Sequence, residues 1–174
     1  APANDNFVNR ILLSGSAPAT TGSNVYATKE SGEPNHAGNT GGASVWWSWT
    51  APASGDATVS TAGSGFDTVL AVYTGGSVSG LTAIAWNDDN GSSYLSLVTF
   101  SAVAGTAYQI AVDGYGGNTG NVSLSVNQGS SNATPTISSV TAGANPVSGN
   151  TTTLAVVASD DGGEANLAYT WNTT

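Results

Sequence analysis

SVWWSWTAP, residues 44–52, places three of the chain's five tryptophans within four positions. Alternate side chains of a β-strand point to opposite faces, so Val45, Trp47 and Trp49 share one face of the predicted strand. Such a face predicts the core of a β-sandwich, because each buried indole removes roughly 150 to 250 Å² of surface from water. Trp46 stands on the opposite face, where it is a candidate for an exposed ring.

Alternation of apolar and polar residues recurs along the chain. It predicts half-buried strands at residues 57–61, 68–73, 95–100, 108–112 and 121–126, separated by glycine- and asparagine-rich turns. Short strands at this spacing indicate an all-β fold, a jelly-roll-like antiparallel β-sandwich, rather than alternating strands and helices. One short helical turn is expected near the N-terminus, at residues 6–13, with Asp5 as its capping residue.

A polar stretch without apolar anchors, QGSSNATP at residues 128–135, is predicted to be a linker. It divides the chain into a sandwich domain at residues 1–127 and a second segment at residues 136–174. Three further strands are predicted in that segment, at 136–140, 152–158 and 167–171. These amount to less than half of an immunoglobulin-like sandwich of about 100 residues. We therefore expect a partial domain, or one that another chain completes.

The charge balance limits the partners that the protein can have. Only 7% of the 174 residues are charged, and two cations face eleven acids to give a net charge of −9. This charge would repel a phosphate backbone or an anionic membrane, so neither nucleic acid nor membrane insertion is expected. The chain has no cysteine, which rules out disulfides and thiolate metal sites. An acidic chain that begins Ala-Pro-Ala after signal cleavage would be secreted or held at the cell surface, which is the expected location.

Several carboxylates are predicted to gather at one end of the sandwich. Asp67 begins one strand and the NDDNG turn at residues 87–91 ends the next, so a hairpin would bring them close together. Calcium takes about 6 to 8 oxygen ligands and tolerates irregular loops, which suits such a group. The candidate calcium ligands are Glu30, Glu33, Asp67, Asn87, Asp88 and Asp89. The alternative is plain turn chemistry, because Asp and Asn hydrogen-bond their own backbone in turns.

Two tryptophans are candidates for ligand contact. Trp46, on the strand face opposite the core, and Trp86, just before the acidic turn, would stack their indole rings on the CH faces of sugars if they are exposed. The alternative for Trp46 is a position beneath a neighbouring loop. Polysaccharide is the partner that these rings predict.

Catalysis is not expected. The single histidine, His36, lies in a loop rich in Gly, Asn and Pro, and no G-x-S-x-G elbow accompanies the serines. We expect His36 to pack within its loop. Pairs of carboxylates can hydrolyse glycosides, but the candidate acids here lie in turns of a small sandwich without a predicted cleft.

Several motifs, in order along the chain, carry a family resemblance. They are NDNF at 4–7, KESGEPNHAG at 29–38, SVWWSWTAP at 44–52, FDTVLAVYTG at 66–75, NDD at 87–89 and AGTAYQIAVDGYGG at 104–117. Together they resemble the bacterial pre-peptidase C-terminal (PPC-like) β-sandwich domains. The tail, with SDDGGEANLAYTW at 159–171, is similar to the first strands of bacterial immunoglobulin-like or PKD-like repeats. The resemblance implies an accessory module of a secreted or cell-surface protein, and it names no ligand.

Two classes of function remain open at this point. The leading hypothesis is a non-catalytic extracellular accessory module, stabilised by calcium, that contacts polysaccharide or anchors a larger secreted protein. The alternative is a structural adhesin or fibre subunit that self-assembles by strand addition through its C-terminal segment, because unpaired strand edges are templates for such contacts.

Overall fold

The computed structural model describes residues 1–129, 136–142 and 154–159. The chain forms two compact units, Ala1–Ser130 and Ser131–Thr174, and each is described by itself. Strands dominate the described residues of both units, and the helices among those residues are single 3-10 turns, η1 (Phe7–Asn9), η2 (Val78–Gly80) and η3 (Tyr115–Gly117). The expected all-β fold is confirmed.

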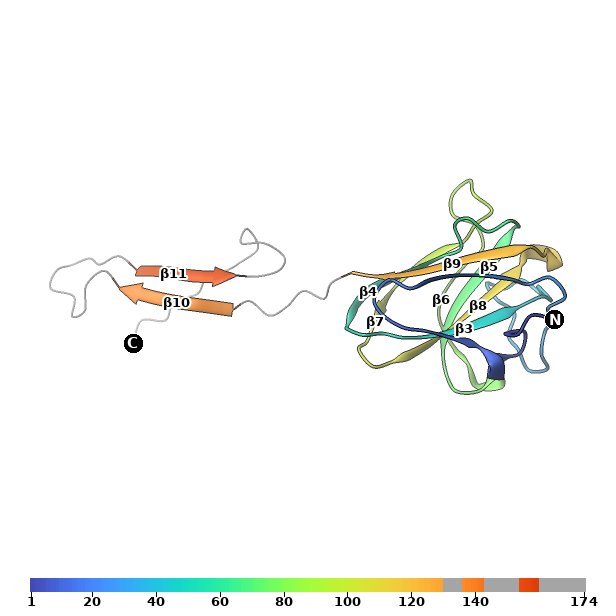
Figure 1. The fold of residues 1–174 in the computed structure, drawn as a ribbon, viewed down its shortest axis with the longest axis horizontal. Helices are drawn as coiled ribbons and strands as arrows, with labels where there is room; N and C mark the ends of the chain where they lie inside the picture. The colour runs from blue at the N-terminus through green and yellow to red at the C-terminus, as the bar shows by residue number, and fades with distance from the viewer. Residues whose placement is uncertain (130–135, 143–153, 160–174) are drawn as a thin grey trace. The chain divides into compact units, whose positions relative to one another are not determined.

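The first unit is a sandwich of two sheets (Figure 1). The five-stranded sheet has the order β1 (Ile11–Leu13), β3 (Val45–Thr50), β8 (Ala107–Gly114), β5 (Thr68–Thr74) and β6 (Thr82–Asn87). The four-stranded sheet has the order β2 (Ala19–Ser23), β9 (Asn121–Gln128), β4 (Gly55–Ser60) and β7 (Leu97–Ala102). All pairs are antiparallel except β1 with β3. The chain crosses between the sheets at most of its connections, as a jelly-roll-like sandwich does.

The opening tryptophan strand lies at the centre of this sandwich. Val45, Trp47 and Trp49 of β3 are buried in the main core between the two sheets, as their spacing predicted. Strands β4, β7 and β9 alternate buried and more exposed residues, because only one face of the four-stranded sheet is covered. Strands β3 and β5 are buried at nearly every position. The five-stranded sheet is therefore covered on both faces.

A second apolar cluster covers the outer face of the five-stranded sheet. Its members are Phe7, Trp46, Ala71, Tyr73 and Ala111. Trp46 is fully buried there, in edge-to-face contact with the rings of Phe7 and His36. The expectation of an exposed Trp46 is therefore wrong, and the alternative position beneath a neighbouring loop holds. The sequence of one strand does not show that its second face is buried, because the residues that cover this face come from distant parts of the chain.

The prediction of a helix at residues 6–13 is wrong except for one 3-10 turn, η1 at Phe7–Asn9. Arg10 leaves the turn in an extended conformation, and Ile11–Leu13 pair with Trp47–Trp49 as the edge strand β1. Leu12 is largely exposed, so the apolar residues do not form one helical face. Asp5 does not cap the turn, because its carboxylate accepts a hydrogen bond from the backbone N–H of Thr28 (2.6 Å) instead.

The sandwich runs slightly past the predicted end at residue 127. The backbone N–H of Gln128 donates to Ser16 O (2.7 Å) and its side-chain amide to Ala53 O (2.6 Å). Gly129 N–H donates to Asp56 O (3.1 Å). The last strand therefore includes the first residue of the predicted linker.

The described part of the second unit is one antiparallel pair, β10 (Thr136–Ala142) with β11 (Leu154–Ser159). Both strands match predicted segments, and the register shifts between Ile137 and Ser139. The third predicted strand, at 167–171, lies outside the described residues. Within the described ranges, no helix is long and apolar enough to span a bilayer.

Candidate functional site

Three carboxylates converge at one end of the five-stranded sheet. Asp67 directly precedes β5, and Asp88 and Asp89 directly follow β6. Because β5 and β6 form an antiparallel hairpin with Leu70 opposite Asn87, the beginning of β5 lies beside the end of β6. One oxygen of each carboxylate lies within 4.8 Å of the others. The structure thus brings together the acids that the hairpin argument paired; we call Asp67, Asp88 and Asp89 the acidic cluster.

The acidic cluster is electrostatically unfavourable as a set of three bare carboxylates. Burial raises the pKa of Asp67, and the charge of Asp89 raises it further. Burial also raises the pKa of Asp88, to which Asp89 and then Asp67 add their repulsion. The Oδ1 atoms of Asp67 and Asp88 are both shielded from solvent without a hydrogen-bond partner. Two buried acceptors without a donor define a site that a cation would satisfy.

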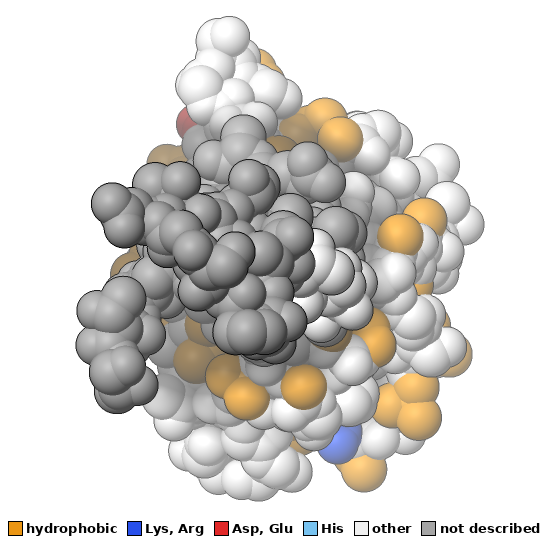
Figure 2. Space-filling model, turned by 90° about the vertical axis from the view of Figure 1, so that its left-hand side faces the viewer, with side chains coloured by type: hydrophobic (Ala, Val, Ile, Leu, Met, Phe, Trp, Pro, Cys, Tyr) orange, Lys and Arg blue, Asp and Glu red, His pale blue; other side chains and the backbone are white. Residues whose placement is uncertain are grey.

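No positive side chain of the protein neutralises this cluster. The chain has two cations, and both are engaged elsewhere. The Lys29 ammonium donates to Asn35 Oδ1 and to Thr40 O, and the Arg10 guanidinium donates to Phe7 O (3.0 Å) and lies over the Phe7 ring. In Figure 2, the surface that is not drawn in grey is mostly white and orange, and charged side chains are sparse on it.

A buried network of hydroxyl groups holds the backbone beneath the cluster. Ser96 Oγ lies 2.6 Å from Thr68 O and 2.8 Å from Asp88 O, and Thr68 Oγ1 lies 2.7 Å from Thr61 Oγ1. Thr61, Thr68 and Ser96 are all essentially unexposed. The network therefore joins the segments that carry Asp67 and Asp88 without using either carboxylate.

Asn87, the predicted amide ligand, lies beside the acidic cluster in the chain and has a structural contact of its own. Its side-chain oxygen accepts the backbone N–H of Leu97 (3.1 Å), which ties the end of β6 to the start of β7. The Asn87 amide thus links the edges of the two sheets, and its role as a calcium ligand stays a prediction.

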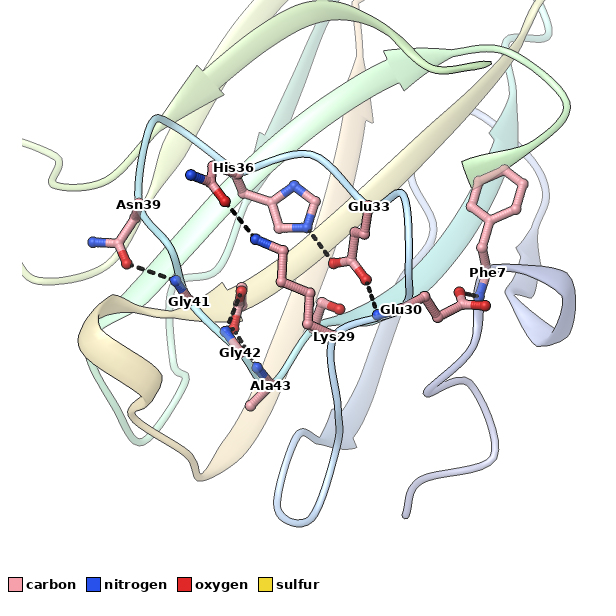
Figure 3. A network of polar contacts seen from close by, with 12 residues as sticks. Phe7, Lys29, Glu30, Glu33, His36, Asn39, Gly41, Gly42 and Ala43 are labelled. Atoms are coloured by element: carbon pink, nitrogen blue, oxygen red, sulfur yellow. Dashed lines mark hydrogen bonds and ion pairs between the residues drawn. The ribbon is translucent and has the colours of Figure 1, made fainter. Parts of the chain in front are cut away.

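Glu30 and Glu33 lie apart from the acidic cluster, so their prediction as ligands of the same ion is wrong. Figure 3 shows them in the loop between β2 and β3. Glu33 accepts the backbone N–H of Glu30 (2.8 Å), and its other oxygen lies 2.8 Å from His36 Nε2. The Glu30 carboxylate accepts the backbone N–H of Phe7. Sequence could not separate these acids from the cluster, because a long loop has no period that fixes where it folds.

A buried Glu33–His36–Tyr73 network was not predicted from the sequence. His36 Nδ1 lies 2.7 Å from Tyr73 Oη, and the His36 ring has no exposed surface. Burial works against the charge of Glu33, but hydrogen bonds from His36, Ser44 and the Glu30 backbone outweigh it and leave the pKa of Glu33 lowered. Burial and then the Glu33 charge raise the pKa of Tyr73. His36 packs within its loop, as expected, and anchors that loop to β5.

Trp86 has the exposed ring that Trp46 lacks. Its side chain is 58% exposed at the end of β6, opposite Ala71 on β5. It borders a cavity of about 260 Å³ on the outer side of the sheet. The lining residues are Pro34, Asn35, Ala37, Gly38, Tyr73, Leu81, Ala83 and Trp86. We call this cavity the Trp86 pocket.

A comparison with protein-family models found none that matches the chain, and a search of curated proteins found no match either.

Proposed function

We propose that the protein is a non-catalytic extracellular accessory module whose sandwich is stabilised by calcium bound at the acidic cluster. The motif resemblance to PPC-like domains supports this proposal, as does the all-β sandwich. In this proposal the module positions or anchors a larger secreted protein, and it contacts polysaccharide through an exposed aromatic ring.

One observation carries the calcium proposal. Three carboxylates offer oxygens within 4.8 Å of one another, and two of their oxygens are buried without any donor. Hard cations such as Ca²⁺ bind carboxylate, carbonyl and water oxygens, and they tolerate an irregular loop better than Mg²⁺ does. An ion would convert the mutual repulsion of Asp67, Asp88 and Asp89 into attraction. Backbone carbonyls and water would supply the remaining ligands.

The test is a thermal melt with calcium and with a chelator. Calcium that binds only the folded state stabilises by about 2.7 kcal/mol at a concentration of about 100 Kd, which for a domain of this size raises Tm by roughly 10 °C. Asp88→Asn should abolish the calcium-dependent rise. Asp56→Asn, which removes a carboxylate bonded to Ser101 away from the cluster, should retain it. Superimposable melting curves in calcium and in chelator would refute the proposal.

The alternative is a structural subunit that assembles by strand addition through the C-terminal segment. Ile137 and Val140 of β10 are 65% and 54% exposed, so this strand presents apolar side chains to solvent. A two-stranded pair is marginal by itself, and further strands from another chain would stabilise it. Size-exclusion chromatography with light scattering separates the two: a monodisperse monomer supports the accessory module, and ordered multimers support the fibre.

A further inference from the structure

We infer that the Trp86 pocket binds one ring of a neutral polysaccharide chain, with the Trp86 indole as its stacking surface and the Asn35 amide as its hydrogen-bond donor. This inference rests on the proposed accessory function and adds the class of ligand and the place where it binds. The acidic cluster is a separate group of residues, so the two proposals are tested separately.

The pocket offers a rigid aromatic wall. Trp86 is the tryptophan with the largest exposure among the described residues, at 58%, and its backbone is held in β6 by pairing with β5. Tyr73, Leu81 and Ala83 supply apolar surface beside it. A pyranose ring has an apolar CH face of the shape and size that an indole covers, so stacking removes apolar surface of both from water.

The opposite wall is a loop segment that is fixed before any ligand arrives. His36 lies between the lining residues Asn35 and Ala37, and both of its ring nitrogens are hydrogen-bonded, to Tyr73 and Glu33. Its carbonyl oxygen also accepts the N–H of Asn39 (2.8 Å). A preformed pocket loses little conformational entropy on binding, which favours affinity for a small group.

Asn35 points its donors away from Lys29. An ammonium group only donates hydrogen bonds, so the Lys29 ammonium fixes the Asn35 carbonyl oxygen towards itself. Asn35 lines the pocket, and its amide NH₂, with two donors, is the side of the group that does not face Lys29. Sugar hydroxyls accept such donors, whereas a purely apolar ligand does not use them.

The volume of the pocket and the charge of the protein limit the class of ligand further. The cavity of about 260 Å³ is smaller than the roughly 300 to 1,000 Å³ of sites that enclose a drug-sized molecule. It therefore accommodates one ring of a longer chain that continues outside. None of its lining residues is charged, and the Lys29 ammonium beside it is already hydrogen-bonded to Asn35 and Thr40. The net charge of −9 disfavours uronic acids and phosphorylated sugars. The ligand class is a neutral glycan.

The experiment is calorimetric titration of the full chain with hexasaccharides, in calcium and again in chelator. The neutral probes are the β-1,4-linked hexamers of glucose, N-acetylglucosamine, mannose and xylose and the α-1,4-linked hexamer of glucose; hexagalacturonate is the anionic probe and decaproline the peptide probe. We expect at least one neutral hexamer to bind and hexagalacturonate not to bind. Trp86→Ala should weaken binding by about tenfold or more, as loss of one aromatic stacking contact predicts, and Trp86→Phe should keep part of it.

Two further variants make the test specific. Asn35→Asp keeps the oxygen for Lys29 but removes the NH₂ donors, so it should also weaken binding. Tyr94→Ala removes a ring that is 69% exposed but does not line the pocket, so it should bind like the wild type. Unchanged melting curves show that each variant is folded, since Trp86 and Asn35 are exposed.

Three results would overturn the inference: no neutral hexamer binds the wild type, Trp86→Ala binds as tightly as the wild type, or only decaproline binds. Sugar binding that depends on Trp86 but persists without any calcium-dependent melting shift would leave the pocket intact and refute the calcium site. A calcium-dependent melting shift without sugar binding would support the calcium site and refute the sugar-binding pocket.

Discussion

A few buried polar side chains hold loop backbone in place by hydrogen bonds, and Asp113 is one of them. The buried carboxylate of Asp113 accepts N–H groups from Gly42, Ala43 and its neighbour Gly114 at 2.8 to 3.2 Å. It thereby fastens the end of the long loop to β8, just before β3 begins. Gly41 makes this approach possible, because a Cβ at that position would lie 1.7 Å from Asp113 Oδ2.

Gly41→Ala should destabilise the sandwich by about 3 kcal/mol, since it adds a steric clash with a buried carboxylate to the strain of a left-handed residue. Gly116→Ala is the matched control. Its φ of +58° is close to the +52° of Gly41, but a Cβ there meets nothing within 4 Å. The control should cost about 1 kcal/mol. Urea denaturation measures both, and equal losses would show that the Asp113 contact does not decide the stability.

The acidic cluster predicts an unusual pH dependence of the calcium-free protein. Asp67 and Asp88 have a pKa raised by burial and by neighbouring carboxylates, so the folded state holds their protons more tightly than the unfolded state. The stability that they contribute is present below the unfolded pKa and is lost as pH rises through the folded pKa.

Asp88→Asn should therefore become more stable than the wild type as pH rises from about 4 towards neutrality. The gain should reach at most about 1 kcal/mol, because these partly exposed charges are screened by solvent. Denaturation in chelator at several pH values measures it, with Asp56→Asn, which removes a carboxylate outside the cluster, as the control. In calcium the sign should reverse, since the variant loses a ligand. A difference that stays flat with pH would mean that the carboxylates do not repel one another.

At the scale of elements, the loop between β2 and β3 behaves as a structural layer. It supplies His36, which hydrogen-bonds to Tyr73 of β5 and to Glu33 of the same loop, and it covers Trp46 on the outer face of the five-stranded sheet. This layer explains why β3 and β5 are buried on both faces although the first unit has only two sheets. Its attachment depends on a few polar contacts rather than on regular pairing.

Tyr73→Phe should loosen this loop. Removal of the hydroxyl leaves the buried His36 Nδ1 without its partner, which costs about 1 to 3 kcal/mol. Residues 24–44 should then be cleaved faster in limited proteolysis, and the Trp86 pocket should bind more weakly because its wall moves. Tyr26→Phe removes a hydroxyl from a side chain that is 83% exposed and should change neither. If the loop is cleaved at the wild-type rate in Tyr73→Phe, its attachment does not depend on the hydrogen bond between His36 and Tyr73.

Local sequence patterns predicted the alternating strands and the acidic hairpin, but they did not predict how the loop between β2 and β3 folds. Strands that alternate, such as β4, β7 and β9, follow directly from the period of two that a half-covered sheet imposes. The convergence of Asp67 with Asp88 also followed, because a hairpin is a local structure. The edge strands β1 and β2 were not predicted, since they are mostly exposed and their residues show no apolar alternation. Trp46 is buried, and Glu33 lies apart from the acidic cluster, because of the way the long loop between β2 and β3 folds. No local sequence pattern predicts the conformation of such a loop.

At the scale of the whole molecule, the main core is complete within the first unit. Every buried residue of that core lies between Val45 and Val126. A sandwich with a core of its own folds independently of a neighbouring unit. We therefore expect residues 1–129 to be an autonomous domain that carries both candidate sites.

Residues 1–129 alone should melt in one cooperative transition within a few degrees of the sandwich transition of the full chain. The fragment should show the same calcium-dependent shift and the same sugar binding. A fragment that ends at residue 126 is the sharper comparison, because it loses Gln128, whose backbone and side chain donate to Ser16 and Ala53, and Gly129, which donates to Asp56. Loss of these three hydrogen bonds, each contributing about 1 kcal/mol, should lower Tm by roughly 10 °C for a domain of this size. If residues 1–129 fail to fold while the full chain melts normally, the second unit is required for the stability of the sandwich and the two units are not independent domains.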